Sequence, residues 1–464
     1  MTSTRAPGST TSDAAQTLAE REAFAVGYHA YLWGYVYVKS MLLRDEATHP
    51  DYKAYAPVNA LHVHTELAKP GFTDFTPNID TLYGLGWLDL SNGPVLMRVP
   101  AMGERYWSVQ ATDAALNCAE YVGRRMGSKP GLYAYCHSRW AGELPAGVHR
   151  IDVPTQTVFI QLRTVVDPAV PGDIEAVAAL NGRIRFEPLN PGFVSAAPLH
   201  TPPRDPKNTA PHFHSLDFFA LLNEAITRDN VVPGEEAVVA QFAALGIGPG
   251  LRFDLARLDA AQQRGLQAGI AAAFARMAAY LAAGAEQIGG WSFLFNLGRY
   301  GHDFLARAVT ACYGYGANEP VEATYPFTVL DAERRPLDGS NRYRIRFAAD
   351  RLPPVDAFWS ITMYSRPENQ LVDNPIGRYN IGSATPGLVW GADGSLEIAV
   401  QHVAPSADTT ADTAAGTANW LPAPAGPFWL ILRMYQPRPQ VLTRQYAPPA
   451  VECLTHSLTT TRRS

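Results

Sequence analysis

Leu85-Gly-Trp-Leu-Asp-Leu, Ser91-Asn-Gly-Pro and Val95-Leu-Met-Arg-Val follow one another directly in the chain, and they indicate its fold class. The first and third runs are short and largely apolar, and turn-forming residues separate them. The same pattern continues in Tyr106-Trp-Ser-Val-Gln and Thr157-Val-Phe-Ile-Gln-Leu. Strands of about five residues with such punctuation predict an antiparallel β-sandwich in this part of the chain.

The last third of the chain repeats this strand pattern. Its runs are Arg342-Tyr-Arg-Ile-Arg-Phe, Ala357-Phe-Trp-Ser-Ile-Thr-Met-Tyr, Ser395-Leu-Glu-Ile-Ala-Val-Gln-His and Phe428-Trp-Leu-Ile-Leu-Arg-Met-Tyr. Asp-Gly turn signals precede two of them. A second sandwich or jelly roll is therefore expected. The predicted fold class is α+β, mainly β, with two antiparallel β-sandwich or jelly-roll-like domains, an N-terminal helix and a central helical segment.

Helical periodicity occurs in two other regions. Phe24, Tyr28, Tyr31 and Tyr35 recur at three- and four-residue steps, which predicts one amphipathic helix over residues 13–44. Tyrosine hydroxyls require partners, so this stripe could line a polar cavity, although ordinary packing is the favoured interpretation. The helical period returns between residues 216 and 311.

The length of 464 residues exceeds that of one typical domain, so several units are expected. The predicted organisation is a disordered N-terminus at 1–12, the N-terminal helix with the first sandwich at 13–190, a connector and helical segment at 191–311, the second sandwich at 312–452, and a tail at 453–464.

Composition excludes several classes of protein. Hydrophobic residues make up 47% and charged residues 17%, which excludes general disorder. Lys and Arg number 38 against 43 Asp and Glu, and no long basic run occurs, so no nucleic-acid partner is expected. The most apolar helical run, residues 266–281, is interrupted by Arg276 and falls short of the ~20 residues that span a bilayer. No membrane association is therefore predicted.

Residues 1–16 lack the basic start and apolar block of an export signal, so we expect a cytoplasmic protein. The four cysteines are widely spaced and predict neither a zinc site nor a disulfide framework. Nucleotide-binding, metalloprotease and nucleophile-elbow motifs are absent. The sequence therefore predicts no cofactor and no metal, with a small-molecule or glycan substrate as the partner. It leaves open whether the chain forms a homo-oligomer.

Two short motifs carry polar residues of catalytic type. In Pro77-Asn-Ile-Asp-Thr-Leu-Tyr, Asn78 and Asp80 favour a tight, side-chain-capped turn before a strand. The turn could be structural, or it could present Asp80 and Tyr83 at the rim of the sandwich. His62 and His64 lie on one face of an extended segment, where they could bind a metal with a third ligand, although such pairs are usually structural.

Longer strings resemble two families of unknown function. Ala30-Tyr-Leu-Trp-Gly-Tyr, Pro57-Val-Asn, Pro77-Asn-Ile-Asp-Thr-Leu-Tyr and Trp87-Leu-Asp-Leu-Ser resemble domain of unknown function 1254. Phe358-Trp-Ser-Ile-Thr-Met-Tyr, Val372-Asp-Asn-Pro-Ile-Gly-Arg-Tyr-Asn-Ile-Gly, Gln401-His and Asn419-Trp-Leu-Pro-Ala-Pro-Ala-Gly-Pro-Phe resemble its usual companion, domain of unknown function 1214. The resemblance implies two sandwich or jelly-roll domains with helical packing elements, but no agreed reaction.

The resemblance also indicates which polar residues form a candidate site. The predicted catalytic residues are His64, Asp80, Tyr83 and Asp113. The predicted substrate-binding residues are Asn59, Asn78, Arg105, Tyr106, Asn117, Arg378, Tyr379 and Trp420.

Two chemistries are open to these residues. Asp80 and Asp113 could form a carboxylate pair, one protonated and the other kept ionised by Arg105, as a glycosidase or hydratase needs. Alternatively, His64 could act as a general base while Tyr83 or Asn78 donates to a developing oxyanion, which suits ester or lactone hydrolysis or a proton-abstracting lyase. The structural alternative is a buried hydrogen-bond network that braces the two sandwiches.

Residues of the second half allow the same two interpretations. Arg378 could bind an anionic substrate or pair with a neighbouring carboxylate. Trp390, Trp420 and Trp429 could form a sugar-stacking platform if exposed, or fill the second core. The predicted function is a cofactor-free hydrolase or lyase with its site between the two β domains. The alternative is a noncatalytic glycan- or metabolite-binding protein.

Overall fold

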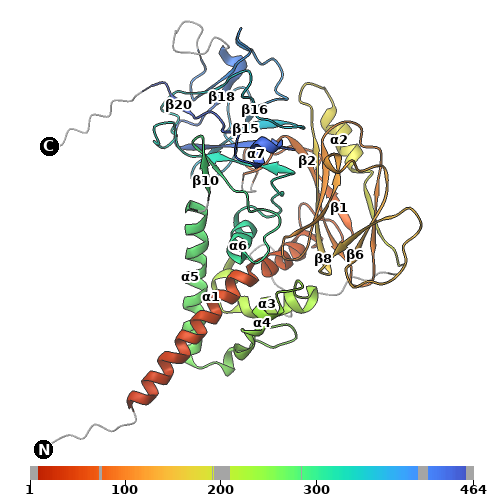
Figure 1. Cartoon of the computed structure of the whole chain (residues 1–464), viewed down its shortest axis with the longest axis vertical. Helices are drawn as coiled ribbons and strands as arrows, with labels where there is room; N and C mark the ends of the chain where they lie inside the picture. The colour runs from red at the N-terminus through yellow and green to blue at the C-terminus, as the bar shows by residue number, and fades with distance from the viewer. Residues whose placement is uncertain are drawn as a thin grey trace, which may run out of the picture.

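The computed structural model describes residues 9–72, 76–190, 192, 210–283, 285–405 and 416–455. Two β-sandwiches adjoin each other, and a group of helices gathers beside them (Figure 1). The mixed architecture, with several mainly antiparallel sheets, a long N-terminal helix and a central helical region, confirms the predicted fold class.

The first sandwich consists of two sheets with a shared apolar core. The first sheet contains, in spatial order, β1 (Ala60–Val63), β2 (Thr81–Asp89), β8 (Thr157–Val165), β4 (Trp107–Thr112) and β5 (Cys118–Gly123). The second sheet contains β7 (His149–Val153), β6 (Gly131–His137), β3 (Val95–Val99) and β9 (Arg185–Pro188). All pairs are antiparallel except β6 with β7. Leu88, Val109 and Ile160 of the first sheet pack against Met97 and Tyr135 of the second.

The second sandwich is built in the same way. One sheet contains β10 (Glu286–Ile288), β11 (Trp291–Phe293), β13 (Phe327–Thr328), β19 (Phe428–Tyr435), β15 (Trp359–Ser365) and β16 (Asn380–Gly382), and β12 (Ala323–Thr324) pairs with β19. The other contains β18 (Trp420–Pro422), β17 (Leu396–Gln401), β14 (Tyr343–Phe347) and β20 (Glu452–Cys453). Ile361 and Leu432 of the first sheet and Ile345 and Ile398 of the other share one core.

The helices are α1 (Ser9–Ala47), α2 (Asp173–Asn181), α3 (Asp217–Asp229), α4 (Glu236–Ala240), α5 (Ala260–Ala283), α6 (Phe304–Tyr313) and α7 (Pro439–Leu442). Helices α1 and α5 lie backbone to backbone, because a Cβ at Gly269 would stand 2.7 Å from the Tyr28 amide nitrogen. Tyr31 and Tyr35 of α1 are buried in the helical core, and the Tyr31 hydroxyl donates to the Phe213 carbonyl. The tyrosine stripe therefore packs in the ordinary way. No helix in the described ranges is long and apolar enough to cross a membrane.

Three predicted boundaries differ from the structure. The helical segment predicted at 191–311 contains β10 and β11, which extend the second sandwich because Trp291 and Phe293 are buried in its core. The disordered N-terminus predicted at 1–12 falls outside the described residues up to residue 8, and α1 already begins at Ser9. The predicted tail begins one residue too early, because Cys453 belongs to β20, and residues 456–464 lie outside the described part. Most of the predicted connector also lies outside it.

The first sheet of the first sandwich has two chemically different faces. Alternation along a strand sends Leu82 and Leu162 to one side and Tyr83 and Arg163 to the other. The apolar side forms the sandwich core, and the polar side packs against the second domain. We call this contact between the polar face and the second domain the seam.

Candidate active site at the seam

A row of polar side chains crosses the polar face at one level. The His64 amide donates to the Tyr83 carbonyl over 2.8 Å, Tyr83 stands opposite Arg163, and Arg163 stands opposite Ser108. Directly opposed residues project from the same face, and neighbouring strands lie ~4.8 Å apart. His64, Tyr83 and Arg163 are therefore consecutive neighbours on β1, β2 and β8.

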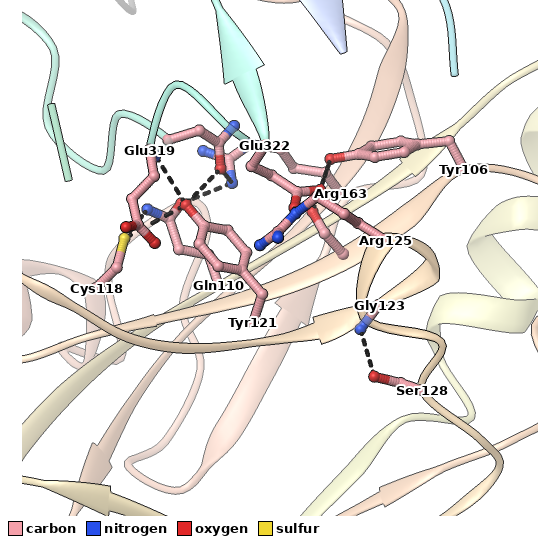
Figure 2. A network of polar contacts seen from close by, with 12 residues as sticks. Tyr106, Gln110, Cys118, Tyr121, Gly123, Arg125, Ser128, Arg163, Glu319 and Glu322 are labelled. Carbon is pink, nitrogen blue, oxygen red and sulfur yellow. Dashed lines mark hydrogen bonds and ion pairs between the residues drawn. The ribbon is translucent and has the colours of Figure 1, made fainter. Parts of the chain in front are cut away.

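Arg163 is buried in this row, with 3% of its surface exposed. Its guanidinium donates to the side-chain oxygens of Gln110 at 2.7 Å, Gln161 at 2.6 Å and Asn318 at 3.1 Å, and to the Gly316 carbonyl at 2.8 Å. Figure 2 shows Arg163 beside Gln110 and below the segment of the second domain that carries Glu319 and Glu322. All four of these acceptors are neutral.

The nitrogen Nε of Arg163 is sealed from solvent without a hydrogen-bond partner. Burial works against the charge of Arg163, but the phenols of Tyr83, Tyr325 and Tyr435 outweigh it and raise the pKa of Arg163. The guanidinium also lies over the Tyr83 ring, 5.6 Å from its centre. Arg163 therefore remains charged, and within the described residues no carboxylate forms an ion pair with it.

Three tyrosines lie near the Arg163 guanidinium. Tyr325 Oη accepts a hydrogen bond from Asn318, and Tyr435 Oη accepts one from Asn78 at 2.8 Å. Neither hydroxyl donates its own proton within the described part of the chain. The hydroxyl of half-buried Tyr83 makes no hydrogen bond to any described residue, and it is not sealed from solvent. The seam therefore offers phenol protons that no described residue accepts.

Asp80 ties the two sandwiches together at the start of β2. Its Oδ2 accepts from Ser360 Oγ of β15, and its Oδ1 accepts from Asn380 Nδ2 of β16, both at 2.6 Å. Burial raises the pKa of Asp80, and Arg433, Ser360 and Asn380 oppose that rise. Asn78 accepts from the Asp80 amide at 2.7 Å, as the predicted capped turn requires.

Arg433 is a residue of β19 and lies close to Asp80. It donates to Thr362 Oγ1 at 2.7 Å and to Tyr364 Oη at 2.6 Å. It forms no ion pair with a described residue, but Asp80 lies close enough to help raise the pKa of Arg433 against the effect of burial. Asp80 therefore balances Arg433 across the seam.

His64 is half-buried at the edge of the row. Burial, and then the neighbouring His62 and Lys53, lower the pKa of His64 to about 4. Its Nε2 is sealed without a partner, and its other ring nitrogen makes no hydrogen bond within the described residues. His64 is therefore neutral at pH 7 and can accept a proton.

The predicted pairing of Asp80 with Asp113 does not occur. The Val166 amide donates to the Asp80 carbonyl, whereas Thr112, which precedes Asp113, stands opposite Phe159. At ~3.3 Å per residue along β8, the two carboxylates lie roughly 25 Å apart at opposite ends of the sheet. Glycosidase carboxylates are separated by only about 5–10 Å, so this geometry excludes a shared acid–base pair.

Asp113 closes the turn between β4 and β5. Its Oδ1 accepts from the amides of Ala115 and Asn117, both at 2.9 Å, and Asn117 Nδ2 donates to its Oδ2. Burial raises the pKa of Asp113 to about 6 against these hydrogen bonds and the nearby Arg307. Asp113 and Asn117 therefore stabilise the turn between β4 and β5, and they do not belong to the seam.

Other predicted residues also have local partners. Arg105 forms a two-pronged ion pair with Asp173, and Asn59 Oδ1 accepts from the Asp89 amide. Tyr106 donates to Glu322 Oε1 at 2.8 Å, which joins the two domains beside Arg163.

In the second domain, Arg378 donates to the carbonyls of Thr417, Ala418 and Trp420, so it stabilises a loop. Tyr379 and Ile79 pack against the same small apolar cluster near the seam. Trp420 and Trp429 are buried, and Trp390 is 47% exposed, so the three tryptophans do not share one platform.

The structure adds seam residues that the sequence analysis did not select: Gln161, Arg163, Asn318, Tyr325, Ser360, Asn380, Arg433 and Tyr435. One signal was available, because Gln161 and Arg163 interrupt an otherwise apolar strand at alternate positions, and Arg433 does the same in β19. In the described residues, no group of three or more His, Cys, Asp or Glu side chains comes together as a metal site, and the four cysteines are unpaired.

Two family models match the chain. Residues 58–188 match a protein of unknown function, DUF1254, and residues 322–439 match a protein of unknown function, DUF1214. No curated protein sequence matches significantly. The crystal structure of the VPA0106 protein from Vibrio parahaemolyticus is similar, with a TM-score of 0.68, 22% identity and coverage of 93% of this chain and 100% of that chain. An uncharacterized protein from Burkholderia cenocepacia matches with a TM-score of 0.44, 12% identity and 96% coverage of both chains.

Proposed function

This chain belongs to the proteins that join a DUF1254 domain to a DUF1214 domain, and we propose that it is a cofactor-independent enzyme of the hydrolase or lyase type whose small-molecule substrate binds at the seam. One observation carries the proposal. His64, Tyr83 and Arg163 are consecutive neighbours, and each has a hydrogen-bonding atom that no described residue uses. Buried polar atoms are normally satisfied, so such a cluster indicates a binding partner from outside the chain.

In the row of His64, Tyr83 and Arg163, the first residue accepts a proton and the other two donate hydrogen bonds. Neutral His64 is the proton acceptor, because its lowered pKa keeps the imidazole unprotonated at pH 7. Tyr83 donates its unused hydroxyl proton toward a substrate oxygen. Negative charge that develops on that oxygen is stabilised by Arg163, which lies over the Tyr83 ring.

Asp80 has a positioning role in this proposal. Both of its carboxylate oxygens are held by the second sandwich, and the Asn78 side chain joins its amide to the Tyr435 hydroxyl. Asp80 thereby fixes the distance between Tyr83 on one domain and Tyr435 on the other. Precise placement of reacting groups is itself a large source of rate enhancement.

This arrangement favours acyl transfer or proton abstraction next to a carbonyl group over glycoside hydrolysis. The two-carboxylate route lacks the geometry it needs, because Asp113 lies at the far end of the sheet from Asp80. A base with an opposed hydroxyl donor, as in His64 and Tyr83, suits a carbonyl substrate.

The experiment is a screen of aryl esters, lactones and β-elimination substrates with the full chain. Variants of Tyr83 and His64 are then assayed on any substrate that is turned over. Tyr83→Phe should lower kcat by about 10²- to 10⁴-fold, the usual contribution of a general acid or base. His64→Gln should be equally damaging. Asp113→Asn is the control, since Asp113 lies outside the seam, and it should retain turnover. A Tyr83→Phe variant as active as the parent would refute the proposed function.

A further inference from the structure

Four hydrogen-bond donors around Arg163 have no acceptor within the described residues. They are the Nε–H of Arg163 and the hydroxyl protons of Tyr83, Tyr325 and Tyr435. The Arg163 guanidinium lies 5.6 Å from the centre of the Tyr83 ring, and Asn318 bonds both Arg163 and Tyr325. The ring centres of Tyr325 and Tyr435 lie 6.3 Å apart. A group that meets several donors at once must be rich in acceptors, as a carboxylate or a phosphate is.

The charges of the seam residues also favour an anionic ligand. Arg125 is paired with Glu322, and Asp80 lies near Arg433. Arg163 is buried, and within the described residues it contacts only neutral acceptors. This leaves an excess of one positive charge at the seam, counted over these five side chains. Buried charges in proteins are normally paired, because an unpaired ion in a poorly polarisable interior is costly.

We propose that Arg163, Tyr83, Tyr325 and Tyr435 form a binding site for a carboxylate group of the substrate. The single excess positive charge selects a monoanion, which a carboxylate supplies, over a phosphate dianion. This inference rests on the proposed function only in assigning the carboxylate to the substrate. Binding of the anion itself can be measured without turnover.

The residues that contact Arg163 leave one of its donors unused. Gly316, which supplies one carbonyl to Arg163, has a φ of +75°, and a Cβ there would stand 2.5 Å from Gln161 Oε1. Gln161, Gln110 and Asn318 hold the guanidinium from the sides through three hydrogen bonds. The Nε–H is the guanidinium donor that these residues leave unused, so it would be the one that bonds the anion.

The test is isothermal titration calorimetry of the full chain with acetate and benzoate, each compared with its neutral amide, acetamide or benzamide. Both carboxylates should bind, and both amides should bind at least about tenfold more weakly, since a hydrogen bond to a charged group contributes about 1.5–3 kcal/mol. Phosphate and sulfate form the second arm, and they should bind more weakly than acetate.

Tyr83→Phe is the decisive variant because it removes a hydroxyl that no described residue uses, so it should fold like the parent. It should weaken carboxylate binding about tenfold. Tyr133→Phe removes a hydroxyl that donates to the Lys129 carbonyl outside the seam, and it should leave the affinity unchanged. Arg163→Met should abolish carboxylate binding.

Three results would overturn the inference: equal binding of carboxylates and amides, tighter binding of phosphate than of acetate, or full carboxylate affinity in Tyr83→Phe. The outcome is separable from that of the proposed function. A chain that binds carboxylates through Tyr83 but shows no turnover in the substrate screen would support the anion site and refute the enzyme. Turnover that depends on His64 without carboxylate binding would do the reverse.

Discussion

Arg307 and Arg163 are both buried guanidiniums, yet their surroundings differ in charge. Arg307 in the helical core pairs with Glu235 through two hydrogen bonds of 2.7 and 3.2 Å, and Trp33 donates to the same carboxylate at 2.6 Å. Arg163 at the seam contacts only neutral acceptors within the described residues. Nε is unpaired in both, so an orphan nitrogen by itself does not distinguish them. The missing counter-charge does, and it is the reason for our proposal that Arg163 binds an anion.

The largest expected effect falls on the paired arginine. Glu235→Gln leaves the Arg307 charge uncompensated in the core, which should lower the free energy of unfolding by about 3–5 kcal/mol. Urea denaturation monitored by circular dichroism measures this. Glu452→Gln, which breaks an exposed pair with Arg344, is the matched control and should cost less than about 1 kcal/mol. Equal losses in the two variants would show that the buried pair is not the stabilising element.

The next largest effect on the free energy of unfolding is expected from His64, which lies in the same row as Arg163. Unfolded His64 has a pKa near 6.5, whereas in the folded chain it is about 4. Between these values the unfolded state binds more protons, so the free energy of unfolding falls as the pH falls. The contribution that is present above pH 6.5 and lost by pH 4 is on the order of 3 kcal/mol. Urea denaturation at pH 7 and pH 4 should show a smaller acid loss in His64→Gln than in the parent. An identical loss would mean that His64 is not held neutral.

A smaller effect on stability is expected at Arg163 itself. Arg163→Met removes four hydrogen bonds but also removes an unbalanced buried charge, so the net loss should be about 1–2 kcal/mol, well below that of Glu235→Gln. The same denaturation assay ranks the two variants. A loss for Arg163→Met as large as for Glu235→Gln would erase the contrast between the two arginines.

The smallest effect is expected at Asp113, which lies near Arg307 and away from the seam. Asp113→Asn should change the free energy of unfolding at pH 7 by less than about 1 kcal/mol, because relief from burying a charge offsets weaker hydrogen bonds to Ala115 and Asn117. The raised pKa of Asp113 makes the folded state bind more protons between about pH 6 and 3.8, so this residue adds stability as the pH falls. Denaturation of Asp113→Asn across that range should lack this gain. A gain as large as the parent's would assign it to another group.

Much of the fold could be predicted because it depends on local patterns. The alternating or continuously apolar runs of β2, β8 and β19 and the helical periodicity of α1 are properties of consecutive residues. The short strands β10 and β11 were missed because three residues carry too little periodicity, and only burial of Trp291 in the second core defines them.

Candidate site residues could be selected from the sequence only within short local motifs. Asn78, Asp80 and Tyr83 lie in one capped turn and the following strand, so a local reading found them. Arg163 and Tyr435 come together only because another domain covers one face of a sheet, and a strand pattern does not say which face that is. The pairing of Asp80 with Asp113 failed for the same reason, since strand register decides which ends of β2 and β4 coincide.

The most direct test is a crystal structure of the full chain, grown without carboxylates and soaked in sodium bromide, with anomalous data collected at the bromine edge. Our account predicts an anomalous peak at the seam in contact with the Nε of Arg163 and the hydroxyl of Tyr83, and none at the paired Arg307. The absence of a bromide peak at the seam, with a protein atom accepting from the Nε of Arg163, would contradict this expectation. A bromide peak of equal occupancy beside Arg307 would also contradict it.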